Sequence, residues 1–100
     1  MNWLKKLFGG VVDAFKADVG REIDRAIEKL GSGQTVSEAV DALHNAVASM
    51  LAKSKLPPPT GAILASLLMM VDWQGLAKKS TDQAIAELNR LKNRIAGARL

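Results

Sequence analysis

This 100-residue sequence has no cysteine and only one histidine, His44. Without cysteine the chain forms no disulfide, binds no metal through thiolates and performs no thiol chemistry. A single histidine does not build a zinc site of the usual kind. A Ser-His-Asp triad would need His44 as its base, and no nucleophile-elbow motif accompanies that residue. We therefore expect a protein that is not an enzyme and binds no metal or cofactor, with His44 on a helix surface or partly packed.

Glycine, proline and aromatic residues are also scarce. The chain has eight glycines and three prolines, and its aromatic residues are Trp3, Phe8, Phe15 and Trp73. Hydrophobic residues nevertheless make up 48% of the sequence, mainly alanine, leucine, valine and isoleucine at helical spacing. This composition predicts an all-α protein rather than a β-sandwich or a β-barrel. We expect a single domain over residues 1–100, folded as a small bundle of about four helices.

Long hydrophobic runs are missing as well. No segment approaches the roughly eighteen uninterrupted apolar residues of a spanning helix, so we predict none. Lys5 and Lys6 precede an apolar run that ends at Asp13, which is too short for a cleavable secretory signal. We expect the protein in the cytoplasm, within a viral particle, or peripherally at a membrane.

The most apolar stretch covers residues 62–73, AILASLLMMVDW. Its large side chains point all round a helix, and such a helix has to be covered on every side. Twelve residues reach only about 18 Å, which is short of a bilayer core. We therefore predict a buried central helix over 61–74, with Asp72 exposed near its end and Gly75 just beyond it. Met50, Met69 and Met70 could form an adaptable binding surface, but their spacing favours the core. Amphipathic helices at 2–30, 36–54 and 81–98 would wrap the central helix, and an extended arrangement would be completed by oligomerisation.

The first predicted helix has a broad apolar face near its start. We expect this face to contact a membrane or a protein partner, and it comprises Trp3, Leu4, Leu7, Phe8, Val11, Val12 and Phe15. The stripe continues through Val19, Ile23 and Leu30, while Gly9 and Gly10 mark a weak point or hinge. Unbent, this helix would be about 42 Å long and would overhang a compact domain of this size. Another copy or another protein would then cover its apolar stripe.

Local signals divide the rest of the chain into helices. A glycine-rich turn at residues 31–34 leads to a capping box from Thr35 to Glu38, and a second capping box runs from Ser80 to Gln83. Three consecutive prolines at 57–59 predict a rigid polyproline linker over residues 56–60.

The net charge of +4 is unevenly distributed. Residues 1–52 hold six cations and seven acids, whereas residues 53–100 hold eight cations and three acids. We predict a basic surface on the last helix, formed by Arg90, Lys92, Arg94 and Arg99. Such a surface suits phosphates, lipid headgroups or an acidic protein surface.

Three functions fit these patterns. The first is a structural or assembly protein that self-associates or docks on a larger complex, such as a small component of a phage virion. The second is a peripheral membrane protein that uses the first fifteen residues. The third is nucleic-acid binding through the basic last helix, which is disfavoured because the cations are spread around the helix and no aromatic residue is interleaved. No small-molecule substrate is expected.

Overall fold

A computed structural model describes the backbone of residues 2–54, 56 and 58–98, and the side chains of residues 10–54, 56 and 60–98. Within these residues the fold is all-α, as predicted, with no strand. The helices are α1 (Asn2–Gly31), α2 (Val36–Lys53), α3 (Pro58–Met69), α4 (Trp73–Ala77) and α5 (Thr81–Gly97).

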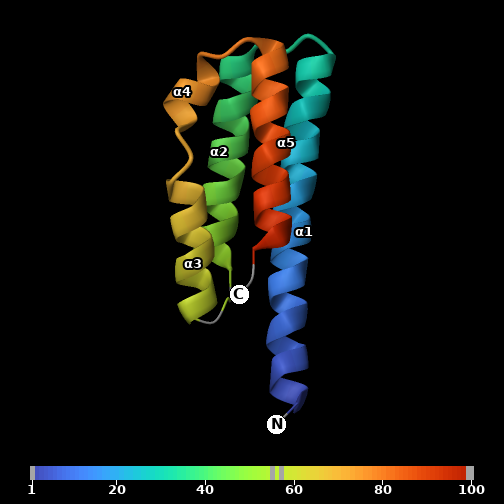
Figure 1. Cartoon of the computed structure of the whole chain (residues 1–100), viewed down its shortest axis with the longest axis vertical. Coiled ribbons are helices and arrows are strands. Elements are labelled where there is room, and N and C mark those ends of the chain that lie inside the picture. Colours follow the sequence, from blue (N-terminus) through green and yellow to red (C-terminus); the bar gives the residue numbers. More distant parts are fainter. Residues whose placement is uncertain (1, 55, 57, 99–100) are drawn as a thin grey trace.

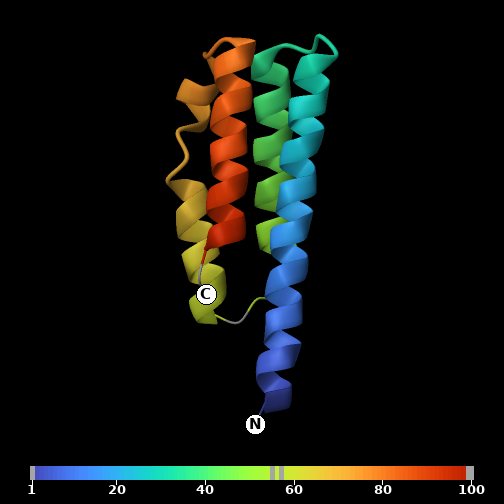
Figure 2. The same ribbon diagram turned by 45° about the vertical axis from the view of Figure 1, so that its right-hand side comes forward.

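The helices form an elongated up-down bundle (Figure 1). α1, α2 and α5 are the three long helices, and α3 and α4 together form a fourth, broken column beside α2 (Figures 1 and 2). The bundle measures 49 × 20 × 20 Å, with a radius of gyration of 14.2 Å. α1 accounts for almost the whole of the long dimension, because thirty residues at 1.5 Å per residue span about 45 Å.

The core follows the predicted helical stripes. Its buried residues are Phe15, Val19, Ile23, Ala26 and Leu30 on α1, Ala39, Val40, Leu43 and Val47 on α2, Leu64 and Leu68 on α3, Leu76 on α4, and Ala84, Leu88, Leu91 and Ile95 on α5. No polar or charged residue is buried among the side chains that the structure describes. Hydrophobic burial along three long stripes therefore holds the bundle together.

Helix ends agree with the predicted caps. Ser80 and Gln83 form the predicted capping box at the start of α5. At the start of α2 the Thr35 hydroxyl accepts the Glu38 N–H at 3.3 Å, but the reciprocal Glu38 bond of the predicted capping box is not formed. Gly33, in the turn after α1, has φ of 100°, a conformation in which glycine avoids the strain of a side chain. α1 is helical through Gly9 and Gly10, where the sequence predicted a weak point.

The prediction of a buried central helix over 61–74 is wrong in position. α3 lies at the edge of the bundle, where Ile63, Met69 and Met70 are 46%, 81% and 77% exposed. The apolar pattern of this segment predicted that α3 must be covered, but it did not identify the segment that covers it. The apolar stripes of α1, α2 and α5 pack mainly on one another and on α4. Of the described side chains of α3, only Leu64 and Leu68 are therefore buried. Met69 and Met70 are therefore not core residues.

The same segment also contains an additional helix boundary. α3 ends at Met69, and the exposed Asp72 begins the short α4 by accepting the Gly75 N–H on Oδ1 at 3.0 Å. Gly75 therefore lies inside α4, whereas the prediction placed it just beyond the end of a helix. The side-chain cap competes with continuation of the preceding helix, and it explains why an uninterrupted apolar run is split in two.

The polyproline linker is also corrected. α3 begins at Pro58, so Pro58 and Pro59 form part of its first turn. Proline is tolerated there because the first backbone N–H groups of a helix have no intrahelical partner. Pro57 lies outside the described residues.

Candidate binding surfaces

Lys16 of α1 contacts the end of α5. Its ammonium group donates hydrogen bonds to the carbonyl oxygens of Ala96 and Ala98, at 3.3 and 2.7 Å, where α5 finishes. These carbonyls lack partners within α5, so a cation at that position also complements the helix dipole. Asp13, one turn earlier on α1, still lines a hollow together with Ala96 of α5.

The first turns of α1 project beyond the other helices as a single arm (Figures 1 and 2). Phe15, at the base of this arm, is 7% exposed and belongs to the chain's own core. Val12 is half-buried, and Val11 is 37% exposed. The predicted contact face therefore leaves the core between Phe15 and Val11. The side chains of Trp3, Leu4, Leu7 and Phe8 lie outside the described residues, although their backbone is helical.

The predicted basic surface is split between two sides of α5. Lys92 faces α1, where its ammonium group lies 2.8 Å from Asp24 Oδ1. Arg90 and Arg94 lie on the other side, towards α3 and α4, and Arg90 pairs with Glu87 at 2.5 Å. Arg99 lies outside the described residues. Lys79, from the α4–α5 connection, joins the two arginines, a grouping that the linear sequence does not reveal.

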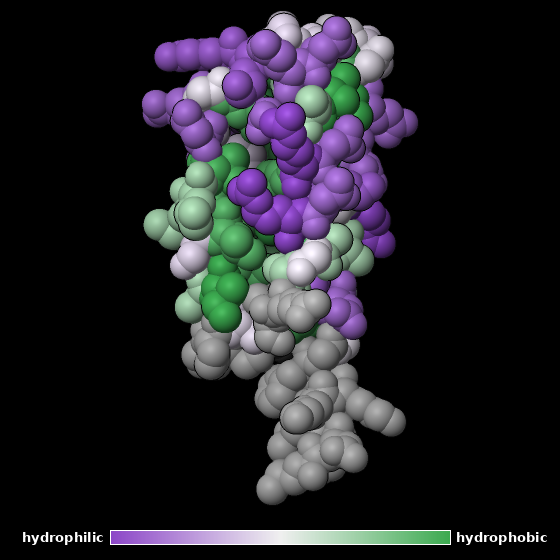
Figure 3. Space-filling model, viewed as in Figure 1, coloured by the Kyte–Doolittle hydropathy of each residue, from purple (hydrophilic) through white to green (hydrophobic). Residues whose placement is uncertain are grey.

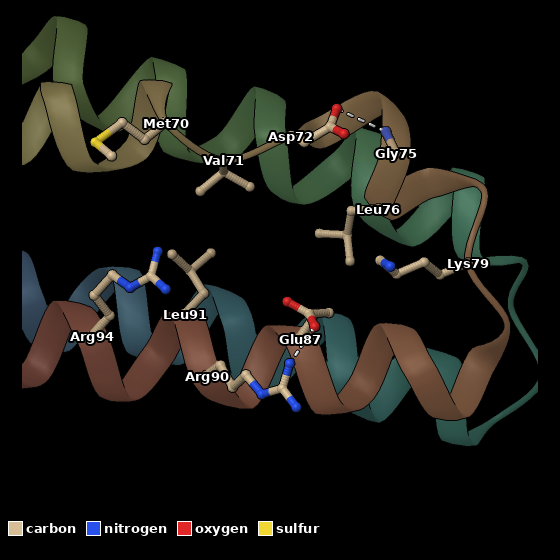
Figure 4. Close-up of a pocket in the computed structure, with 10 residues that line it drawn as sticks. All are labelled: Met70, Val71, Asp72, Gly75, Leu76, Lys79, Glu87, Arg90, Leu91 and Arg94. Carbon is tan, nitrogen blue, oxygen red and sulfur yellow. Dashed lines mark hydrogen bonds and ion pairs between the residues drawn. The ribbon is translucent and has the colours of Figure 1, made fainter.

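A groove separates α5 from the column formed by α3 and α4 (Figure 4). Its volume is about 240 Å³, and its apolar lining comes from Met70, Val71, Leu76 and Leu91. Its polar lining consists of three cations, Lys79, Arg90 and Arg94, and two acids, Asp72 and Glu87. Asp72 caps α4 and Glu87 pairs with Arg90, so each acid already has a partner within the chain.

Hydrophobic side chains gather over α3 beside this groove (Figure 3). We call this surface the α3 patch and define it as Ile63, Leu67, Met69 and Met70. Leu67 is half-buried and the other three are exposed. α3 carries no charged residue. The sequence predicted a central position for this most apolar helix and favoured the core for its methionines, so the patch was not predicted.

A second hollow, of about 260 Å³, lies between α2 and the column of α3 and α4. It is lined by His44, Val47, Ala48, Leu51, Leu68, Met69 and Trp73. The imidazole of His44 stacks on the Trp73 indole, whose Nε1 donates to the Leu68 carbonyl at 3.2 Å. His44 is therefore a packed surface residue, in agreement with its predicted position.

Within the described part of the chain, no three His, Asp or Glu side chains gather as a metal site. No described helix combines the length and apolarity needed to cross a membrane. Comparison of the chain with models of protein families, with curated proteins and with solved structures finds no match.

Proposed function

We propose that this chain is a non-enzymatic assembly protein that joins copies of itself, or a larger complex, through the projecting arm of α1. The observation that carries this proposal is that the first turns of α1 project beyond the ends of the other helices as a single arm (Figures 1 and 2). The 30 residues of α1 span about 45 Å at 1.5 Å per residue, almost the whole 49 Å length of the molecule.

The arm has little reason to be a stable helix on its own. Isolated helices shorter than about twelve to fifteen residues are marginal in water. Gly9 and Gly10 each cost about 1 kcal/mol relative to alanine in a helix interior. Packing of an apolar face supplies most of the stability of such helices in proteins, and Val11, the first described member of the stripe, is 37% exposed. A partner would provide it.

The apolar stripe of the core runs on into the arm. The series Leu30, Ala26, Ile23, Val19 and Phe15 is buried, and its next member, Val11, is partly exposed. In the sequence the same spacing continues to Phe8 and Leu4. A partner helix that lies along these positions would extend the existing core without rearrangement of the bundle.

The first test is the molar mass of the full chain, measured by light scattering on a sizing column without detergent. Self-association predicts a sharp multiple of 10.7 kDa. Val11→Asp should reduce that mass because it places a charge on the stripe. Ala17→Asp places the same charge on an exposed position of α1 within the bundle and should leave the mass unchanged.

If the chain is a monomer, hydrogen exchange distinguishes an arm that docks on a different protein from an arm that needs no partner. A monomer whose arm exchanges freely supports docking on a different protein, because the arm is then unsatisfied in isolation. A monomer at all concentrations whose arm amides are strongly protected would overturn the proposal, since the arm would need no partner.

A further inference from the structure

We propose that the α3 patch and the cations beside it form a docking surface for a bilayer of anionic lipid. This surface is distinct from the arm of α1, and the inference does not depend on self-association. The inference rests on two exposed methionines, Met69 and Met70, at the end of an uncharged helix. Met70 lines the groove that also holds Lys79, Arg90 and Arg94.

The apolar part of this surface projects from the molecule. Met69 and Met70 are 81% and 77% exposed, and Ile63 on the same helix is 46% exposed. Exposed apolar patches of this kind mark protein or membrane interaction sites. Methionine is unbranched and flexible, so two adjacent methionines adapt to the irregular boundary between headgroups and acyl chains.

The polar part of the surface is cationic. In Figure 4 the Arg94 side chain lies across the groove from Met70 and Val71, and Lys79 lies at the far end beside Leu76. Glu87 pairs with Arg90 and neutralises it, but among the described residues no acid forms an ion pair with Lys79 or Arg94. The cations therefore lie at the side of the apolar patch, where they would meet headgroup phosphates once the methionines enter the interface.

A second copy of the chain fits this surface less well. Symmetric dimers use the same patch on both subunits, so an interface centred on α3 would place one set of cations near its own counterpart. The arm of another copy is no better, because Lys5 and Lys6 would add two further cations. An anionic bilayer removes this repulsion and supplies the missing negative charge.

The test is co-sedimentation of the full chain with vesicles of phosphatidylcholine alone or mixed with phosphatidylglycerol. Binding should require phosphatidylglycerol and should weaken as salt is raised. Each cation near an anionic surface contributes about 1 kcal/mol, so Lys79→Gln with Arg94→Gln should weaken binding about thirtyfold. The matched control is Arg21→Gln with Arg25→Gln, which removes the same charge from the exposed face of α1 and should have a much smaller effect.

The methionines need their own variant. Met69→Ser with Met70→Ser should weaken binding about tenfold or more, because it removes the side chains that would enter the interface. Both positions are exposed, so circular dichroism should show an unchanged fold. Retention of full binding by this variant would overturn the proposal, and so would an equal loss in the α1 control or no binding to phosphatidylglycerol.

Labelling provides a direct readout, because the chain has no native cysteine. An environment-sensitive fluorophore on Met70→Cys should shift to shorter wavelength with phosphatidylglycerol vesicles, whereas the same probe on Ser37→Cys should not. If the fluorophore on Met70→Cys shifts without lipid and the molar mass doubles, the patch is an interface between copies. That result would overturn the proposal. Failure of the α1 arm to associate would leave these results unchanged, so the two proposals fail separately.

Discussion

The imidazole of His44 stacks on the indole of Trp73, with 4.7 Å between the ring centroids and 5° between the ring planes. This contact joins the middle of α2 to the first residue of α4. The indole Nε1 also donates to the Leu68 carbonyl in the last turns of α3. Trp73 therefore links both parts of the broken column to each other and to α2.

Loss of this stack should destabilise the bundle measurably. Aromatic pairs contribute about 0.5–1.5 kcal/mol beyond the area that they bury, so a double-mutant cycle of His44→Ala and Trp73→Leu should give a coupling in this range. Urea denaturation of the four proteins measures that coupling. A coupling of zero would show that the two rings lie together without stabilising each other.

Gly75 should be an exception to the usual effect of alanine in a helix. Alanine is favoured over glycine by about 1 kcal/mol in helix interiors, and Gly20→Ala in α1 should be stabilising by about that amount. At Gly75, however, a Cβ atom would overlap the Asp72 carboxylate that caps α4. Gly75→Ala should therefore destabilise the protein by about 1 kcal/mol or more, the cost of a lost N-cap.

The Asp72→Ala background provides the control for this prediction. Once the carboxylate is absent, Gly75→Ala should cost nothing or become stabilising, which thermal unfolding of the four proteins would reveal. An equal destabilisation with and without Asp72 would contradict the proposed overlap.

The sequence predicted best where a helix had one apolar stripe and explicit caps. α2 and α5 each bury one apolar stripe and begin at the predicted Thr35 and Ser80 caps, and their last residues differ from the prediction by one. These features are local, because a stripe and a cap are both contained in a few turns of one helix.

The prediction failed where the outcome depended on competition between segments. The apolar character of residues 62–71 indicated burial, but the three long helices bury their stripes mainly on one another and on α4. Whether Asp72 ends one helix or begins the next also depends on the packing of Leu76 and Trp73 against the bundle. The cationic groove was missed for a related reason, since Lys79 and Arg94 meet only in the folded chain.

Lys16 should contribute more to stability than the other charged contact between α1 and α5. Its hydrogen bond to the Ala98 carbonyl is partly buried and satisfies a helix end, whereas Lys92 and Asp24 form an exposed ion pair. Lys16→Met, which retains the aliphatic stem, should cost about 1–2 kcal/mol. Lys92→Met should cost at most about 1 kcal/mol, as is usual for exposed pairs. Urea denaturation ranks the two variants, and the reverse order would contradict this assignment.

Leu64 and Leu88 test whether α3 opens independently of the rest of the bundle. Both side chains are fully buried, but Leu64 belongs to the peripheral α3 and Leu88 to α5, which packs along α1. Leu88→Ala should cost about 3–5 kcal/mol and reduce amide protection throughout α1, α2 and α5. Leu64→Ala should cost about 2–3 kcal/mol, and because α3 has few other contacts its amides should lose protection before those of the long helices. Native-state hydrogen exchange measures both patterns. Simultaneous loss of protection in α3 and α1 on Leu64→Ala would show that the column of α3 and α4 is an integral part of one cooperative unit, and not an edge element that can open alone.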